Sequence, residues 1–196
     1  MTRKTGHLYV MSAPSGGGKT TLCRQLLKAT PGLVRSVSMT TRRMRRGEVE
    51  GKDYLFTSPN TFRRLRREGK LLEWTRYNRS FYGTPLLPLK RALAQGKDVI
   101  LLLDVRGARV VKRRFKDATT IFLLPPTLED LKKRLIRRKT EKRSDIVRRL
   151  RLAKKEMAQT TWYDHVVVND RLKQALRALQ KIIRRKKRDR RNADLG

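Results

Sequence analysis

A short glycine-rich segment, Ser12 to Thr21, combines three consecutive glycines with a lysine and two threonines. Glycines let the backbone turn tightly, so its N–H groups and the positive end of a following helix can surround an anion. Lys19 could reach the β- and γ-phosphates of a nucleotide, and the Thr20 hydroxyl could reach Mg²⁺. The spacing matches G-x-x-x-x-G-K-[ST] except at its first glycine. The segment therefore predicts a nucleoside triphosphate site. The residues predicted to surround the triphosphate are Ala13, Pro14, Ser15, Gly16, Gly17, Gly18, Lys19, Thr20 and Thr21.

The residues on either side predict the strand and the helix that such a loop needs. Residues 8–11 form a short apolar run typical of a buried strand. After the loop, Leu22, Cys23 and Leu26 fall on one face of a helix. The alternative, a glycine-rich hairpin with an incidental lysine, requires neither element.

A second cluster, residues 38–54, contains four arginines, a hydroxyl-rich beginning and a tyrosine at its end. Two spaced arginines and a tyrosine hydroxyl can hold a phosphate from several sides. Further along, Glu73 is a carboxylate that could accept hydrogen bonds from paired N–H donors on a base edge. Taken alone, the arginines could equally form a solvated basic turn, and Glu73 could be a surface carboxylate.

The order of these motifs, from about residue 6 to about residue 183, resembles the guanylate kinase family. The resemblance implies transfer of the γ-phosphoryl of ATP to GMP or dGMP, with Mg²⁺ as cofactor, in purine nucleotide metabolism. It implies that the GMP phosphate is bound by Arg42, Arg45, Tyr54 and Tyr82. It implies that guanine is bound by Ser38, Glu73, Thr84 and Asp104.

Residues 131–141 resemble the start of the mobile lid that closes over ATP in this family. The resemblance implies that Arg134 and Arg138, with Arg149 from the following helix, meet the phosphates. The predicted catalytic residues are Lys19, Arg42, Arg134, Arg138 and Arg149. The family has glycines beside the second lid arginine, whereas this chain has Arg137 and Lys139, so we expect a stiffer lid and slower turnover.

Two polar residues near strand ends have alternative interpretations. Asp104 follows an apolar run, where P-loop proteins often place a carboxylate that steadies Mg²⁺, whereas the resemblance places it on the guanine side. Leu102 stands where the family typically has a first aspartate, which weakens the metal interpretation. Asn169 matches the family's segment near adenine, and it could also cap the last helix.

Alternation of strands and helices predicts an α/β fold, the three-layer P-loop NTPase fold with a parallel central sheet. Continuous apolar runs at 99–103, 120–124 and 165–168 are typical of strands covered on both faces. Thr127 and Asp130 predict a capping box that opens a helix. We expect one domain over 1–196. Its predicted parts are a core (6–37, 91–130 and 152–183), a β-rich GMP-binding lobe (38–90), a helical lid (131–151) and a basic tail (184–196).

The chain has 51 lysines and arginines against 17 acidic residues, a net charge of +34. Such a field attracts polyanions. The tail, predicted to fray into disorder after Ile183, suggests weak, nonspecific nucleic-acid binding.

A single cysteine, Cys23, excludes a disulfide framework. The absence of a long apolar run or a signal sequence favours a cytoplasmic protein without membrane association. Two alternative functions are a catalytically silent interaction module of the same family and a related P-loop kinase with another phosphorylated acceptor.

Overall fold

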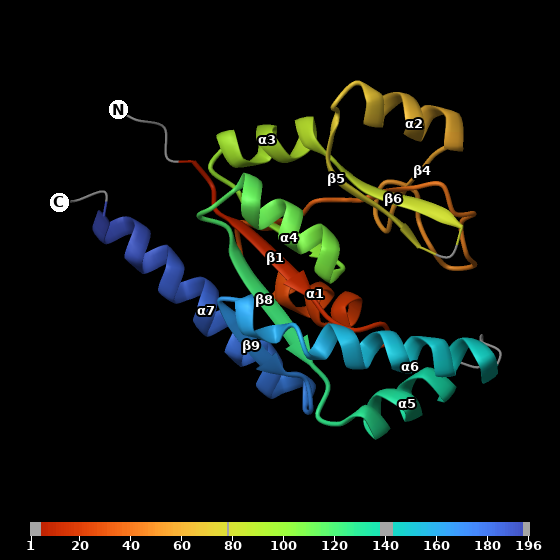
Figure 1. Cartoon of the computed structure of the whole chain (residues 1–196). Helices are drawn as coiled ribbons and strands as arrows, with labels where there is room; N and C mark the ends of the chain where they lie inside the picture. The colour runs from red at the N-terminus through yellow and green to blue at the C-terminus, as the bar shows by residue number, and fades with distance from the viewer. Residues whose placement is uncertain (1–4, 78, 138–142, 194–196) are drawn as a thin grey trace. The chain divides into compact units, whose positions relative to one another are not determined.

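The computed structural model describes residues 5–77, 79–137 and 143–193 (Figure 1). Its main sheet has five strands in the order β2-β7-β1-β8-β9. Strand β2 pairs in parallel with β7, and β8 pairs in parallel with β9. Most residues of β1, β7 and β8 are buried, as a parallel sheet covered on both faces requires. The α/β fold with a parallel central sheet is thereby confirmed. The strands are β1 Leu8–Ser12, β2 Leu33–Arg35, β7 Asp98–Leu103, β8 Thr119–Leu124 and β9 His165–Val168.

Helices alternate with these strands along the chain. Helix α1 buries Leu22, Cys23 and Leu26, so Cys23 is part of the core. The capping box at the start of α5 is confirmed, because the Asp130 N–H donates to the Thr127 hydroxyl at 3.0 Å. The helices outside the second sheet are α1 Lys19–Lys28, α3 Leu86–Ala94, α4 Val105–Arg114, α5 Leu128–Arg137, α6 Arg143–Met157 and α7 Leu172–Ala193, with a 3₁₀ turn at Thr160–Trp162.

A second, four-stranded sheet is formed within residues 39–85, in the order β4-β3-β6-β5. Strands β5 and β6 form an antiparallel pair, and α2 (Pro59–Arg67) precedes them. Ser58 starts α2 by accepting a hydrogen bond from the Thr61 N–H, and Pro59 occupies the first turn. This sheet confirms the β-rich lobe, whereas its limits at 38–90 and those of the lid stay predictions. The strands are β3 Met39–Thr40, β4 Leu55–Phe56, β5 Leu71–Tyr77 and β6 Ser80–Pro85.

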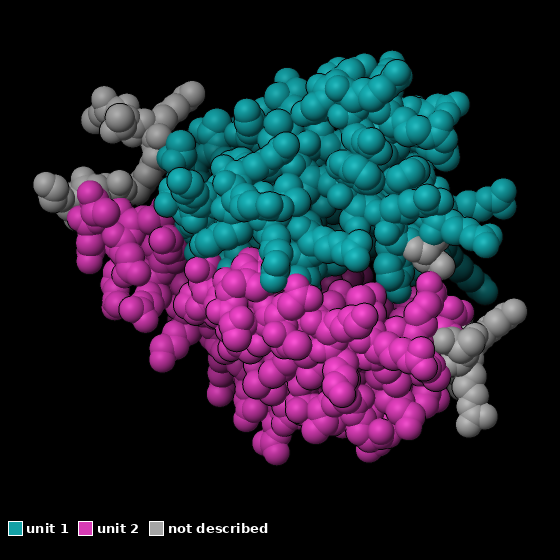
Figure 2. Space-filling view, in the orientation of Figure 1, with its two compact units in different colours: residues 1–10, 32–120 teal, residues 11–31, 121–196 magenta. Residues whose placement is uncertain are grey.

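The chain divides into two compact units, which Figure 2 shows in different colours. The first comprises residues 1–10 and 32–120, and the second comprises residues 11–31 and 121–196. Every residue predicted to bind GMP belongs to the first unit, and every residue predicted to bind ATP belongs to the second. Each candidate half-site is therefore built within one unit.

The prediction that the chain frays after Ile183 is wrong for residues 184–193, because α7 continues through Ala193 (Figure 1). The helix is anchored by buried Ala175, Leu179 and Ile183, and the following arginines and lysines are good helix formers without a glycine or proline to stop them. Among the helices described, none combines the length and apolar character needed to cross a bilayer.

Candidate active site

The glycine-rich loop joins β1 to α1 as predicted. Gly16 and Gly18 have φ angles of 89° and 88°, in the region that glycine adopts without strain. The Gly17 N–H donates to the Pro14 carbonyl at 2.8 Å, and Gly18 stands at the N-cap of α1. The Lys19 ammonium folds back onto this loop and donates to the Ala13 carbonyl at 2.8 Å. The backbone thus has the tight turn and helix N-terminus that hold a polyphosphate.

Three side chains from later segments of the second unit support this loop. Asn169, which is 6% exposed, donates from Nδ2 to the Gly17 carbonyl at 2.8 Å. Arg149 Nη1 donates to Ser15 Oγ at 3.2 Å, and Arg134 Nη2 donates to the Asn169 carbonyl at 2.9 Å. Arg134, Arg149 and Asn169 are therefore brought together around the loop. The direct bond from Asn169 to Gly17 is a loop-supporting contact that the sequence did not reveal.

Apolar packing fixes α5 against the same loop. A Cβ atom at Gly16 would lie 2.9 Å from Leu135 Cδ2 and 3.2 Å from Leu131 Cδ1. Leu131 and Leu135 belong to a buried cluster with Ala153 of α6. Gly16 is thus required both for its φ angle and for the close approach of α5. Arg138, the second predicted lid arginine, lies outside the described residues, as does Lys139.

On the first unit, Glu73 is a buried carboxylate held by one hydroxyl. It is 4% exposed, and its Oε1 accepts from Thr84 Oγ1 at 2.6 Å. Asp104, at the N-cap of α4, accepts from the Gly107 N–H at 2.7 Å. A Cβ atom at Gly107 would lie 2.9 Å from Glu73 Oε2 and 3.4 Å from Asp104 Oδ1, so the two carboxylates converge beside this glycine. Glu73, Thr84 and Asp104 are brought together, and half-buried Ser38 lies just before β3.

The pKa of Glu73 is raised from 4.5 to about 7, chiefly by burial and also by the nearby negative charge of Asp104, against the lowering effect of the Thr84 hydrogen bond. Ionised Glu73 is therefore costly in the free protein. Guanine N1–H and N2–H₂ are donors that could replace the lost hydration of this carboxylate.

This pKa predicts a pH-dependent stability effect. Between pH 4.5 and 7 the folded protein keeps a proton on Glu73 that the unfolded chain has released, so the contribution of Glu73 to stability falls as pH rises through this range. Glu73→Gln should raise the free energy of unfolding at pH 8 by up to about 3 kcal/mol, with most of the gain lost near pH 5. Urea unfolding at both pH values measures this. Glu68→Gln, which alters an exposed carboxylate of α2, should show no such gain and serves as the control.

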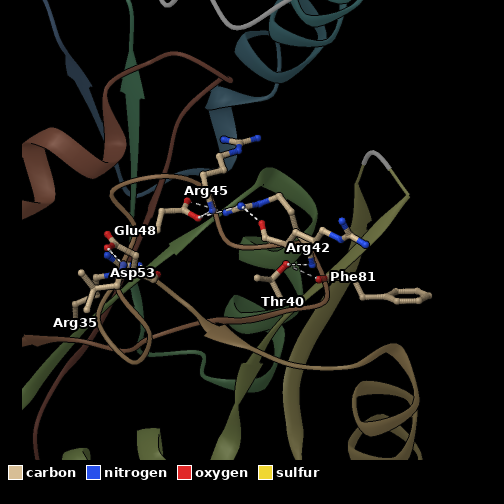
Figure 3. Close-up of polar contacts among 9 residues, drawn as sticks. Arg35, Thr40, Arg42, Arg45, Glu48, Asp53 and Phe81 are labelled. Carbon is tan, nitrogen blue, oxygen red and sulfur yellow. Dashed lines mark hydrogen bonds and ion pairs between the residues drawn. The ribbon is translucent and has the colours of Figure 1, made fainter.

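Arg42 is clamped in the loop that follows β3 (Figure 3). Its Nη2 and Nη1 donate to Glu48 Oε1 and Oε2 at 2.8 and 3.0 Å. The rings of Tyr54 and Phe56 lie 5.3 and 5.7 Å from the guanidinium carbon. Burial alone would lower the pKa of Arg42, but the hydrogen bonds to Glu48 and the nearby Tyr82 raise it.

Of the other three residues predicted to bind the GMP phosphate, Tyr54 and Tyr82 lie near this guanidinium. The Tyr54 and Tyr82 rings are 6.0 Å apart, and burial raises the pKa of Tyr54, as does the neighbouring Tyr82. Arg45 is exposed, and Figure 3 shows its guanidinium pointing away from the Arg42–Glu48 pair. Glu48 itself was not predicted, although an acidic residue two positions after a run of four arginines is a signal that could have marked it.

Thr20 lies in the first turn of α1 with an exposed side chain. Its hydroxyl is a hard oxygen donor of the kind that Mg²⁺ prefers, so the position fits the predicted metal contact. Within the described part of the chain, no three histidine, cysteine or acidic side chains gather into a metal site.

A glycine-rich loop between a parallel strand and a helix in one unit, together with two converging carboxylates and a clamped arginine in the other, defines a P-loop kinase of nucleotides. The sequence profile of the guanylate kinase family matches residues 5–186. The chain belongs to this family, whose members are ATP:GMP phosphotransferases.

Individual relatives agree with this assignment. Guanylate kinase of Syntrophotalea carbinolica is 42% identical over 181 residues, covering 92% of this chain and 86% of the relative. Guanylate kinase of Trichodesmium erythraeum is 43% identical over 180 residues, covering 92% and 97%. The crystal structure of guanylate kinase from Anaplasma phagocytophilum is similar with a TM-score of 0.79 and 32% identity, covering 95% of this chain and 88% of that one.

Proposed function

We propose that this chain transfers the γ-phosphoryl of ATP to GMP, giving ADP and GDP, with the residues divided between the two half-sites described above. The observation that carries the choice of acceptor is the convergence of buried Glu73 and of Asp104 beside Gly107. A buried carboxylate with a raised pKa needs hydrogen-bond donors, and the Watson–Crick edge of guanine offers two adjacent N–H groups. Adenine offers an acceptor at N1 instead.

The donor nucleotide is bound by the loop of the second unit. Backbone N–H groups from Gly16 to Lys19 and the N-terminus of α1 surround its phosphates. Lys19 leaves the Ala13 carbonyl to follow the γ-phosphoryl, and the Thr20 hydroxyl holds Mg²⁺. When bound, Mg²⁺ neutralises charge on the β- and γ-phosphates. Asn169 keeps Gly17 in place and contacts the adenine side of the nucleotide.

The protein contributes mainly position and positive charge, because phosphoryl transfer needs little covalent help. Arg42, Tyr54 and Tyr82 orient the attacking GMP phosphate, and exposed Arg45 reaches it from the same loop. Lys19, Arg134 and Arg149 place cations on the moving phosphoryl group, a role that Arg138 shares in our proposal. The stiffer lid expected from Arg137 and Lys139 remains a prediction about turnover.

A coupled assay of ADP production tests this function directly, with GMP, dGMP, AMP, CMP and UMP as acceptors in the presence of Mg²⁺ and ATP. Turnover restricted to the guanine nucleotides supports the proposal. Binding of GMP without any turnover would instead favour the silent interaction module. Equal use of another acceptor would favour a related P-loop kinase.

A second activity, weak and nonspecific nucleic-acid binding, is proposed for the end of α7. The ten helical residues after Ile183 are basic at seven positions and acidic only at Asp189. A basic helix end without large apolar side chains binds phosphates by releasing counterions and has no such side chain to insert into a lipid bilayer. No step of phosphoryl transfer uses these residues. A cytoplasmic location is part of the same proposal.

Neutralising this helix end should remove its share of the binding. We expect replacement of the basic residues in 184–191 by glutamine, or deletion of residues 184–196, to weaken binding to poly(U) and to flatten its dependence on salt, with the kinase rate retained. Fluorescence anisotropy across a salt series measures the binding. Unchanged poly(U) binding would assign the effect to the rest of the chain's charge, and no binding by the unmodified protein near physiological salt would dismiss the activity.

A further inference from the structure

Glu48 makes a two-point contact with the guanidinium of Arg42 in a partly buried setting. The side chains of Arg42 and Glu48 are 15% and 19% exposed, and both carboxylate oxygens accept from Arg42. Burial alone would raise the pKa of Glu48, but hydrogen bonds from Arg42 and from the Arg45 backbone hold it below its ordinary value. A bidentate pair of this kind fixes the plane of the guanidinium as well as its position.

The same carboxylate also closes the turn that carries it. The Arg45 N–H donates to Glu48 Oε2 at 2.8 Å, and the Glu48 N–H donates to the Arg45 carbonyl at 3.1 Å. Figure 3 shows this pair at the centre of the polar contacts in the loop. Glu48 therefore connects the backbone of the turn to the side chain of Arg42.

The donors of Arg42 show which of its edges is left for a ligand. Both N–H groups of Nη1 are used, one by Glu48 at 3.0 Å and one by the Arg43 carbonyl at 2.6 Å. One N–H of Nη2 is used by Glu48 at 2.8 Å. A guanidinium has five N–H groups, so the edge formed by Nε–H and the second Nη2–H is engaged by neither Glu48 nor Arg43. Tyr82, which also interacts with Arg42, is itself predicted to bind the phosphate and would share it with this edge. This edge is a two-donor fork of the shape that a phosphate accepts.

We propose that Glu48 is a positioning residue that holds Arg42 with this second fork turned toward the phosphate of GMP. The inference rests on the proposed function, because it assigns Arg42 to the acceptor phosphate. Freezing a long side chain on binding costs affinity, and a side chain already held in place avoids much of that cost.

The negative charge of Glu48 reduces the attraction of Arg42 for a phosphate, and this effect opposes positioning. In this loop, however, positive charge is abundant, since Arg43, Arg45 and Arg46 are all exposed beside it. Phosphate binding in this loop is therefore limited by the orientation of the Arg42 guanidinium and not by the amount of positive charge. A different arrangement, in which the phosphate displaces Glu48 and takes over its bonds to Arg42, predicts the opposite effect of neutralising Glu48.

A double-mutant cycle separates these possibilities. Glu48→Gln should raise the Kd and KM for GMP about tenfold, the size expected for a lost charge-assisted pair, while kcat changes less than about twofold. Guanosine, which has no phosphate, should bind the variant as it binds the unmodified protein. In an Arg42→Ala background the same substitution should change the Kd for GMP by less than about twofold. Isothermal titration calorimetry and initial rates give these values.

Glu50→Gln is the matched control, because Glu50 lies in the same loop and its oxygens accept only from the Phe56 backbone among the bonds described for it. It should leave the Kd for GMP unchanged. If Glu48→Gln still raises the Kd for GMP about tenfold in the Arg42→Ala background, Glu48 acts on the fold of the turn, and the proposal is overturned. A lower KM in Glu48→Gln would overturn it in favour of displacement. If the unmodified protein binds GMP without turnover, the kinase function fails, yet the binding cycle still decides the role of Glu48.

Discussion

GMP should exceed AMP as phosphoryl acceptor by about 10⁴-fold in kcat/KM, because a site built to accept the N1–H and N2–H₂ of guanine rejects adenine, which lacks both. Glu73 is 4% exposed and has a single hydroxyl donor, Thr84 at 2.6 Å, among the contacts described for it. Adenine would leave the carboxylate buried opposite an acceptor, at the desolvation cost of an unpaired polar group. Initial rates with each nucleotide under identical Mg²⁺ and ATP give the ratio.

Glu73→Gln tests whether this carboxylate is the source of the discrimination. The amide presents a donor where guanine also presents donors, so we expect a loss of kcat/KM for GMP of about 10²-fold or more and a smaller change for AMP. Glu68→Gln changes an exposed carboxylate of the same unit and should leave both rates alone. Similar kcat/KM values for GMP and AMP in the unmodified enzyme would contradict the guanine assignment itself.

The strands of the main sheet could be predicted because each carries its own signal. Residues 99–103 and 120–124 are continuous apolar runs, and β7 and β8 begin within one residue of them. Strand β2 was not predicted, since it has only three residues, Leu33–Arg35, and two of them are half-buried. Its place at the sheet edge is set by pairing with β7, which is a long-range effect.

The residues of the candidate site also divide into those that a local sequence pattern predicts and those that only the folded chain brings together. The glycine-rich loop could be predicted because its chemistry lies in consecutive residues. The support that Asn169 gives to Gly17 joins residues 152 positions apart, and no local pattern specifies such a bond. The Arg42–Glu48 pair spans only six positions, but it lies in an irregular loop, where spacing does not determine which side chains face each other.

The C-terminal end of α7 shows that amino-acid composition alone does not decide whether a segment is ordered. A run of like charges predicts fraying, because the charges repel one another and face water. Here the buried residues Leu179 and Ile183 anchor the helix just before the run, and Lys187 reaches back to the Pro31 carbonyl at 3.4 Å. Propagation of an existing helix is far easier than its nucleation, so the anchored turns carry the basic segment with them.

Lys19→Ala should lower kcat by about 10²- to 10³-fold while the Kd for GMP stays unchanged. The ammonium lies at the start of α1 and is now bonded to the Ala13 carbonyl at 2.8 Å, within reach of the loop that surrounds the triphosphate. A cation that follows the γ-phosphoryl interacts most strongly in the transition state, so its removal affects kcat more than ground-state binding. Every residue assigned to GMP belongs to the other compact unit, which is why GMP binding should persist.

Lys28→Ala provides the matched control for this experiment, because Lys28 has the same side chain, lies in the last turn of the same helix and is exposed. It removes one charge from the second unit without touching the loop, so a general electrostatic effect on nucleotide encounter would appear in both variants. Single-turnover rates at saturating ATP and GMP isolate the transfer step. If Lys19→Ala keeps the unmodified rate, Lys19 does not contribute to phosphoryl transfer. If Lys28→Ala lowers the rate as much as Lys19→Ala, Lys19 acts through the general electrostatic field of the protein and not by contact with the transferred phosphoryl group.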